Sequence, residues 1–108
     1  MIDREKVNIV LVEDNINDSE LIMRHLKQNK LANDVRLMKD GSEVLEYLFG
    51  KDGHGGIALD EFPHLIILDL KLPKVSGLDV LRRLKSEEKT KTIPVVILTR
   101  VLQPFLKG

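Results

Sequence analysis

The chain has 108 residues, and its 17 lysine and arginine residues balance 17 aspartate and glutamate residues, giving a formal net charge of zero. This balance gives no electrostatic reason to expect a nucleic-acid partner or an anionic membrane surface. Cysteine is absent, which excludes disulfides, thiolate nucleophiles and cysteine metal sites. No apolar run approaches the roughly 18 residues of a membrane span, and the first residues do not resemble a signal peptide. We therefore expect a single soluble, cytoplasmic domain over residues 1–108.

The first predicted elements are a buried strand and an amphipathic helix. Residues 7–12 (VNIVLV) form an almost unbroken apolar run, which is typical of a strand buried on both faces of a parallel sheet. Helical spacing follows over residues 17–29, with Asn17 or Asp18 as the expected cap. The side of this helix expected to face the core holds Leu21, Ile22, His25 and Leu26.

The middle of the chain predicts a short strand, a second helix and a loop. Residues 34–39 alternate weakly between polar and apolar side chains, which favours a strand. A helix capped by Asp40 or Ser42 follows, and Gly50 suits its end. Residues 51–63 contain three glycines and mixed charges, which indicates a loop. The apolar face of the helix holds Val44, Leu45, Leu48 and Phe49.

The last part of the chain predicts two more buried strands with a helix between them. Residues 65–68 form the first of these strands, and residues 93–98 form the second, with Pro94 near its start, where a strand tolerates proline. Ser76 is the expected cap of the helix, whose inward face holds Leu78, Val80, Leu81 and Leu84. The order β-α-β-α-β-α-β predicts an α/β fold with a parallel sheet and helices on both faces.

Acidic residues follow two of the predicted strands, and a threonine follows another. Glu13 and Asp14 end the first strand, Asp69 ends the third and Thr99 ends the fourth. Sites in open α/β sheets form at the carboxyl ends of the strands, so these side chains meet if the three strands are neighbours. Three close carboxylates repel one another, and Mg²⁺ relieves that repulsion while also binding phosphoryl oxygens. The pattern predicts a Mg²⁺ site in which one carboxylate attacks phosphorus and forms an acyl phosphate.

These residues together resemble the receiver domain of two-component response regulators, over residues 6 to about 99. The resemblance rests on the acid pair Glu13-Asp14, on Asp69, on the loop LPKVSG and on Thr99 after PVVIL. The stretch LVEDNINDSELI and the long loop before PHLIILDLKLPK resemble one subgroup in particular. That subgroup consists of small single-domain receivers that serve phytochrome-like histidine kinases in cyanobacteria and similar sensor kinases in archaea.

The resemblance implies a role for each residue of the site. Asp69 is expected to accept a phosphoryl group from a histidine of a sensor histidine kinase. Asp14 and Asp69, helped by Glu13 through water, are expected to hold Mg²⁺, with the backbone carbonyl of Lys71 as a further ligand. Thr99 is expected to bond a phosphoryl oxygen.

The resemblance also implies a conformation for the loop after Asp69 and a strand order for the sheet. Pro73 and Gly77 are expected to shape this loop so that the Lys71 carbonyl points inward. The resemblance further implies a flavodoxin-like parallel sheet with strand order 2-1-3-4.

The end of the sequence departs from the family pattern. Receivers normally continue past Thr99 through a helix, a fifth strand that ends in lysine and a last helix, so we expect a C-terminally truncated domain without these elements. Lys107 does not stand in the position of the missing lysine, and Arg100 replaces the small residue usual beside the threonine, with a role left open. The fourth strand, residues 93–98, would then be an exposed edge. We expect a homodimer through this strand and the C-terminal tail.

The sequence is compatible with three functions. The first is a phosphoacceptor signalling switch on Asp69, and the second is a degenerate receiver that acts as a phosphorylation-independent dimerising or interaction module. The third is a phosphatase of the haloacid dehalogenase type, which needs an acid two residues after its nucleophile, where this chain has Lys71. We therefore expect no enzyme beyond the receiver's own phosphorylation and dephosphorylation, and protein partners rather than nucleic acid.

Overall fold

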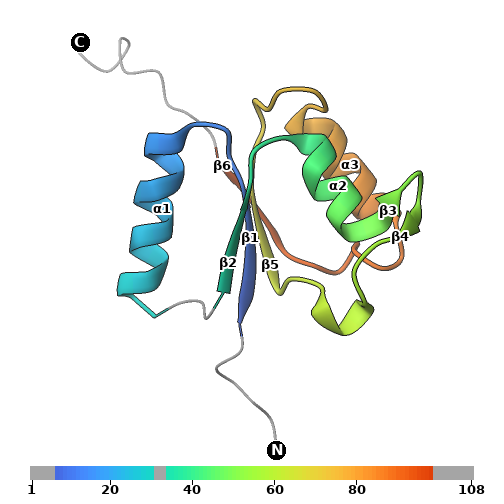
Figure 1. Ribbon diagram of the computed structural model, residues 1–108, viewed down its shortest axis with the longest axis horizontal. Helices are drawn as coiled ribbons and strands as arrows, with labels where there is room; N and C mark the ends of the chain where they lie inside the picture. The colour runs from blue at the N-terminus through green and yellow to red at the C-terminus, as the bar shows by residue number, and fades with distance from the viewer. Residues whose placement is uncertain (1–6, 31–33, 99–108) are drawn as a thin grey trace, which may run out of the picture.

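The computed structural model describes residues 7–30 and 34–98, and its centre is a four-stranded parallel sheet (Figure 1). The strands lie in the order β2-β1-β5-β6, which confirms the flavodoxin-like order predicted from the sequence. Their register places Ile9 of β1 between Val35 of β2 and Leu65 of β5. The strands are β1 (Asn8–Val12), β2 (Asp34–Met38), β5 (Leu65–Asp69) and β6 (Val95–Leu98).

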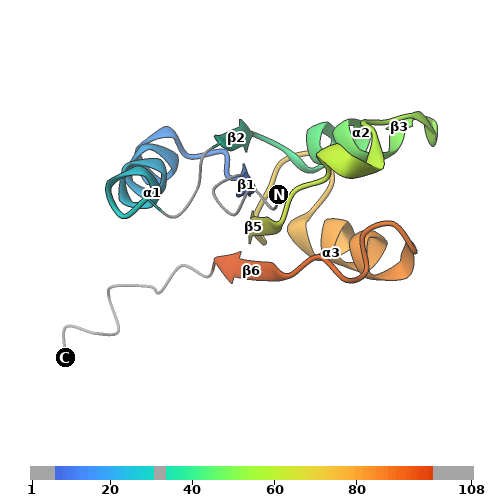
Figure 2. The same cartoon turned by 90° about the horizontal axis from the view of Figure 1, so that it is seen from below.

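Helices cover both faces of this sheet. The helix α1 (Ile16–Gln28) lies on one face, whereas α2 (Gly41–Phe49) and α3 (Gly77–Ser86) lie together on the other (Figures 1 and 2). Among the described residues, no helix combines the length and the apolar character that crossing a membrane requires.

The core has two layers because successive strand residues point to opposite faces. On the α1 face the buried cluster contains Ile9, Leu11 and Ile67, which pack with Leu26 of the helix. On the other face the strands contribute Val10, Val12, Ile66 and Leu68 to the cluster that packs under α2 and α3. The apolar runs of β1 and β5 are therefore buried on both faces, as predicted, whereas β6, also predicted as a buried strand, is only partly buried.

The helix α1 differs in detail from the prediction. Its N-cap is Asn15, whose Oδ1 accepts a hydrogen bond from the N–H of Asp18 at 2.9 Å, so the predicted caps were wrong. Leu21 is 54% exposed and His25 is also exposed, so neither belongs to the buried side. The residues that face the sheet are Ser19, Ile22, Met23 and Leu26, at the spacing i, i+3, i+4, i+7. The predicted side and the observed side share Ile22 and Leu26, and packing against the sheet selects the one that includes Ser19.

The segment predicted as a loop over residues 51–63 contains ordered structure. A small antiparallel hairpin joins β3 (Gly50–Lys51) to β4 (His54–Gly55), and a 3₁₀ turn, η1, spans Leu59–Glu61. The two residues at the tip of the hairpin, Asp52 and Gly53, both have positive φ, 55° and 81°. An Asp-Gly pair in this conformation is a favoured two-residue hairpin turn, so the sequence carried a local signal for it.

Two predicted inward-facing residues are exposed. Leu78 in the first turn of α3 is 45% exposed, whereas Val80 and Leu84 are fully buried as predicted. Val96 of β6 is 47% exposed, because β6 is an edge strand of the described sheet and Val96 lies beside Ile67 on the α1 face. The strand begins at Val95, so Pro94 precedes it.

The buried hydroxyl group of Thr90 supplies a hydrogen-bond donor to a carbonyl group at the end of α3. Its Oγ1 donates to the carbonyl of Leu84 at 2.7 Å, and that carbonyl lies in the last turn of the helix, where intrahelical donors are lacking. The change Thr90→Val is expected to lower the free energy of unfolding by about 1–3 kcal/mol, because the carbonyl then lies buried without its donor. Urea denaturation measures this loss. Thr92→Val, at an exposed position, is the matched control, and an equal loss in both variants would contradict the role of the hydrogen bond.

Candidate functional site

Three acidic side chains meet at the carboxyl end of the sheet. Glu13 and Asp14 directly follow β1, and Asp69 is the last residue of β5, the strand paired with β1. The structure brings one carboxylate oxygen of each residue to within 4.8 Å of the others. The cluster forms because Val12 lies opposite Leu68, so both strands end at the same level.

The environment of Asp69 is unusual for a carboxylate. The residue is 3% exposed, and its Oδ1 accepts a hydrogen bond from the N–H of Lys71 at 3.0 Å. Its Oδ2 is buried and has no hydrogen-bond partner among the residues that the structure describes. A buried acceptor without a donor costs about 1–3 kcal/mol, so this oxygen would gain most from an external cation or donor.

The other two acids differ from each other in exposure. Glu13 is 3% exposed, and its Oε2 accepts a hydrogen bond from the N–H of Asn15 at 3.0 Å, which holds the carboxylate beside the start of α1. Asp14 is exposed. The site therefore has a buried pair of acids, Glu13 and Asp69, and one acid in contact with solvent.

The loop that follows Asp69, residues 70–76, is anchored at the strand end. The N–H of Gly77 donates to the carbonyl of Leu70 at 3.0 Å. A Cβ atom at Gly77 would lie 2.2 Å from the carbonyl oxygen of Asp69, so this contact requires glycine. The side chains of Lys71 and Pro73 are exposed, so of Lys71 it is the main chain that contacts the site.

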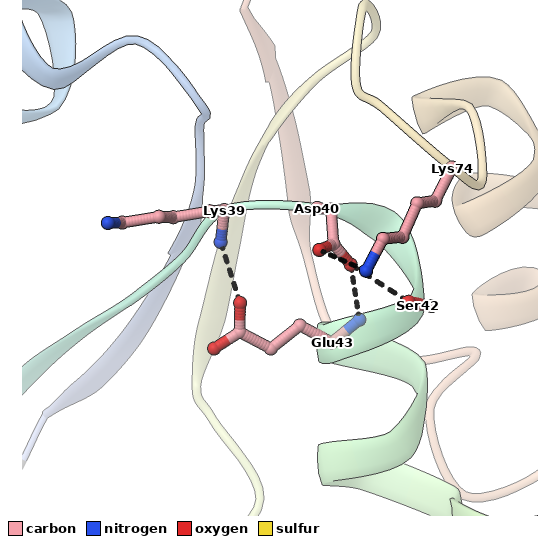
Figure 3. A network of polar contacts seen from close by, with 5 residues as sticks. All are labelled: Lys39, Asp40, Ser42, Glu43 and Lys74. Carbon is pink, nitrogen blue, oxygen red and sulfur yellow. Dashed lines mark hydrogen bonds and ion pairs between the residues drawn. The ribbon is translucent and has the colours of Figure 1, made fainter.

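A polar network at the start of α2 reaches the same loop (Figure 3). Asp40 is the N-cap of α2, and its Oδ1 accepts hydrogen bonds from the N–H of Glu43 at 2.8 Å and from Ser42 Oγ at 2.9 Å. Its Oδ2 lies 3.6 Å from the Nζ of Lys74 in the loop. The hydrogen bond from Glu43, with smaller contributions from Ser42 and Lys74, lowers the pKa of Asp40 against the opposing effect of burial.

Sequence reasoning found only part of this network. Asp40 is one of the two predicted caps, and the spacing Asp40-x-x-Glu43 is typical of a capping box. The Glu43 side chain differs from that motif, because its Oε1 accepts from the N–H of Lys39, the residue before the cap, at 2.9 Å. The contact with Lys74 joins residues 34 positions apart, and no local pattern indicates it. Thr99, Arg100 and Lys107 lie outside the described residues, so their predicted roles stay predictions.

A parallel α/β sheet with three clustered carboxylates at its carboxyl end is the arrangement expected of a signalling receiver module. The family described as the response regulator receiver domain matches residues 9–106, and the chain belongs to this family.

The relatives of this chain include regulators of the subgroup that the sequence resembled. The probable methanogenesis regulatory protein FilR2 of Methanothrix harundinacea (strain 6Ac) is 42% identical over 91 residues, which are 84% of this chain and 56% of that protein. The structure of the phosphorylated cyanobacterial phytochrome response regulator RcpA matches with a TM-score of 0.76 and 38% identity, over 94% of this chain and 71% of that chain. The Mn²⁺-bound form of response regulator Rcp1 matches with a TM-score of 0.72 and 33% identity, over 88% and 66%. The chain therefore spans little more than half the length of FilR2.

Proposed function

We propose that this receiver is a phosphoacceptor switch in which Asp69 takes a phosphoryl group from a phosphorylated histidine of a sensor histidine kinase. One observation carries the proposal most directly. Asp69 Oδ2 is buried at the acid cluster without a hydrogen-bond partner among the described residues, while Oδ1 of the same carboxylate is held by the Lys71 N–H. This arrangement distinguishes the two oxygens and supports Oδ2 as the proposed nucleophile. The relative RcpA, whose structure is that of a phosphorylated protein, supports the proposal.

The acidic residues fit a divalent cation. Ligands of one Mg²⁺ lie about 2.0–2.1 Å from the ion, and carboxylate oxygens of Asp14 and Asp69 that already lie within 4.8 Å of each other need only a small approach to share it. We propose that Asp14 and Asp69 hold Mg²⁺, with Glu13 acting through water and the backbone carbonyl of Lys71 as a further ligand. Rcp1, a relative with a Mn²⁺-bound structure, supports a divalent cation at this site. When bound, the ion would neutralise charge on the phosphoryl oxygens.

The chemistry required of the chain is a single displacement. A bond forms between Asp69 Oδ2 and phosphorus, and the bond from phosphorus to the donor's leaving atom breaks, so that an acyl phosphate results. The Lys71 N–H orients the carboxylate, and the exposed Asp14 lies on the side open to solvent. Thr99 is proposed to donate to a phosphoryl oxygen. We propose no enzymatic activity beyond this self-phosphorylation and its reversal by hydrolysis.

The test is the intact mass of the protein after incubation with Mg²⁺ and acetyl phosphate. We expect a gain of one phosphoryl group in wild type, none in Asp69→Asn, and at least about tenfold slower phosphorylation in Asp14→Asn, which loses a metal ligand. Asp79→Asn is the matched control, because this exposed acid pairs with Arg82 on α3 away from the cluster, and it should behave as wild type. A folded wild type that gains no mass, here and with a purified histidine kinase as donor, would favour the phosphorylation-independent interaction module.

The remaining parts of the proposal concern partners and location. The kinase partner implies a cytoplasmic site of action, and the balanced charge supports protein partners rather than nucleic acid. The homodimer predicted through residues 93–98 and the C-terminal tail stays a prediction. Its support is that β6 is an edge strand of the described sheet with Val96 47% exposed, a surface suited to pairing.

A further inference from the structure

The loop between β5 and α3 is fixed at its two ends by the strand that carries Asp69. The N–H of Lys71 donates to Asp69 Oδ1, and the N–H of Gly77 donates to the Leu70 carbonyl, both at 3.0 Å. These contacts hold residues 70, 71 and 77. Within the middle of the loop, Leu72 and Val75 pack against the hydrophobic core and Ser76 caps α3, which leaves Pro73 and Lys74 as its outermost residues.

The first turn of α2 packs directly against the middle of the loop. A Cβ atom at Gly41 would lie 2.1 Å from the carbonyl oxygen of Val75 and 2.8 Å from its Cβ. Gly41 is buried, and the contact is with backbone, which cannot turn away as a side chain can. The start of α2 and the loop therefore cannot move independently.

Lys74, next to Val75, adds a polar contact between the same two segments. Its φ of +66° is a left-handed backbone conformation that lysine adopts only rarely, and such residues persist when the surroundings hold them. Its side chain reaches Asp40 Oδ2 at 3.6 Å, as Figure 3 shows. Asp40 is a fixed anchor, because its other oxygen accepts hydrogen bonds from Glu43 and Ser42 at the start of α2.

We infer that Asp40 and Lys74 are positioning residues, whose ion pair holds the loop so that the main chain at Lys71 stays aligned with Asp69 and the acid cluster binds a divalent cation more tightly. The inference rests on the proposed function, since it assigns these residues to the proposed metal site. Neither side chain belongs to the acid cluster, so their effect is transmitted through the backbone of residues 71–75.

The sign of the effect separates positioning from simple electrostatics. Removing the positive charge of Lys74 from the neighbourhood of an acidic site should, by charge alone, strengthen the binding of a cation. Losing the position of the loop should weaken it. Asp40→Asn keeps the helix cap, because asparagine caps helices about as well as aspartate, and it removes the charge that Lys74 contacts. Charge alone would also weaken cation binding in this variant, so the sign of the effect is decisive in Lys74→Gln.

The experiment measures the affinity for Mn²⁺ from the electron paramagnetic resonance signal of the free ion. An exposed ion pair has a small energy, so we expect affinity to fall about threefold in Lys74→Gln and in Asp40→Asn. The double variant should be no weaker than either single variant, because both remove the same contact. Lys74→Arg should keep the wild-type affinity. Lys91→Gln, which removes an equal charge and a different ion pair, that with Glu88, should also keep it.

The possible results distinguish the positioning role of Lys74 from the metal site and from a general loss of stability. Unchanged or tighter binding in Lys74→Gln, or losses that multiply in the double variant, would overturn the positioning role while leaving the metal site intact. A wild type that binds no Mn²⁺ would overturn the proposed metal site and the positioning role with it. A thermal unfolding midpoint shared by Lys74→Gln and Lys91→Gln would show that the change in affinity is not a general loss of stability.

Discussion

Replacing Asp69 by asparagine is expected to raise the free energy of unfolding of the metal-free protein by about 1–3 kcal/mol. The carboxylate is 3% exposed, its Oδ2 lacks a hydrogen-bond partner among the described residues, and two further acids lie within 4.8 Å. Asparagine keeps an oxygen that accepts the Lys71 N–H, and it replaces Oδ2 with an amide donor that faces acceptors. Urea denaturation in the presence of a chelator measures the gain.

Adding Mg²⁺ should make wild type more stable than Asp69→Asn. A ligand at 1,000 times its dissociation constant stabilises the folded state by about 4.1 kcal/mol, which exceeds the gain expected from the substitution, and the variant lacks one of the charges that would bind the ion. Asp79→Asn removes an exposed carboxylate and should change stability by no more than about 0.5 kcal/mol in either condition. If Asp69→Asn is less stable than wild type in chelator, the acid cluster is not under the electrostatic strain that its geometry indicates.

If Asp69→Asn is more stable than wild type, Asp69 lowers the stability of the fold and is present for a reason other than folding. Core positions such as Leu68, next to Asp69, are fully buried and apolar, and they serve packing alone. Asp69 departs from that pattern at the last residue of the same strand. An apolar or amide side chain there would be buried at a smaller cost in folding free energy. A residue that destabilises its own fold points to a site with another role, as active sites commonly do.

The sheet and the acid cluster could be predicted because both follow from rules that act along a strand. The runs ending at Val12 and Leu68 are apolar on both faces, which fixed their place in the centre of a parallel sheet. Once β1 and β5 are neighbours, the residues directly after them must share an edge. Periodicity located the strand ends, and the strand order that the family resemblance implies brought Glu13, Asp14 and Asp69 together without any knowledge of side-chain packing.

Features that depend on packing between segments could not be predicted in the same way. The stripe of α1 that faces the sheet includes Ser19 and leaves Leu21 exposed, because the rotation of a helix is decided by what it packs against. The ion pair between Asp40 and Lys74 joins two segments far apart in the sequence, and nothing around Lys74 indicates its left-handed backbone. The hairpin at Asp52 and Gly53 is different, because its turn had a recognisable local signal.

The change Gly77→Ala is expected to lower the free energy of unfolding by about 3 kcal/mol and to slow phosphorylation of Asp69. The added Cβ would lie 2.2 Å from the Asp69 carbonyl oxygen and 2.5 Å from the Leu70 Cα, and both are backbone atoms, so the strand end or the start of α3 must shift. Urea denaturation and the rate of mass gain with acetyl phosphate measure the two effects.

Gly55→Ala is the matched control for this substitution, because it isolates the cost of backbone conformation from that of a close contact. Gly55 has open space around its Cβ position but a φ of +88°, so alanine there pays only the left-handed penalty of about 1 kcal/mol. The control should phosphorylate at the wild-type rate, since the β3–β4 hairpin that contains Gly55 has no residue in the acid cluster. Equal losses of stability and of phosphorylation in the two variants would contradict the close contact behind Asp69. A loss of phosphorylation confined to Gly77→Ala would show that the backbone at the end of β5 has to be held in place for Asp69 to react.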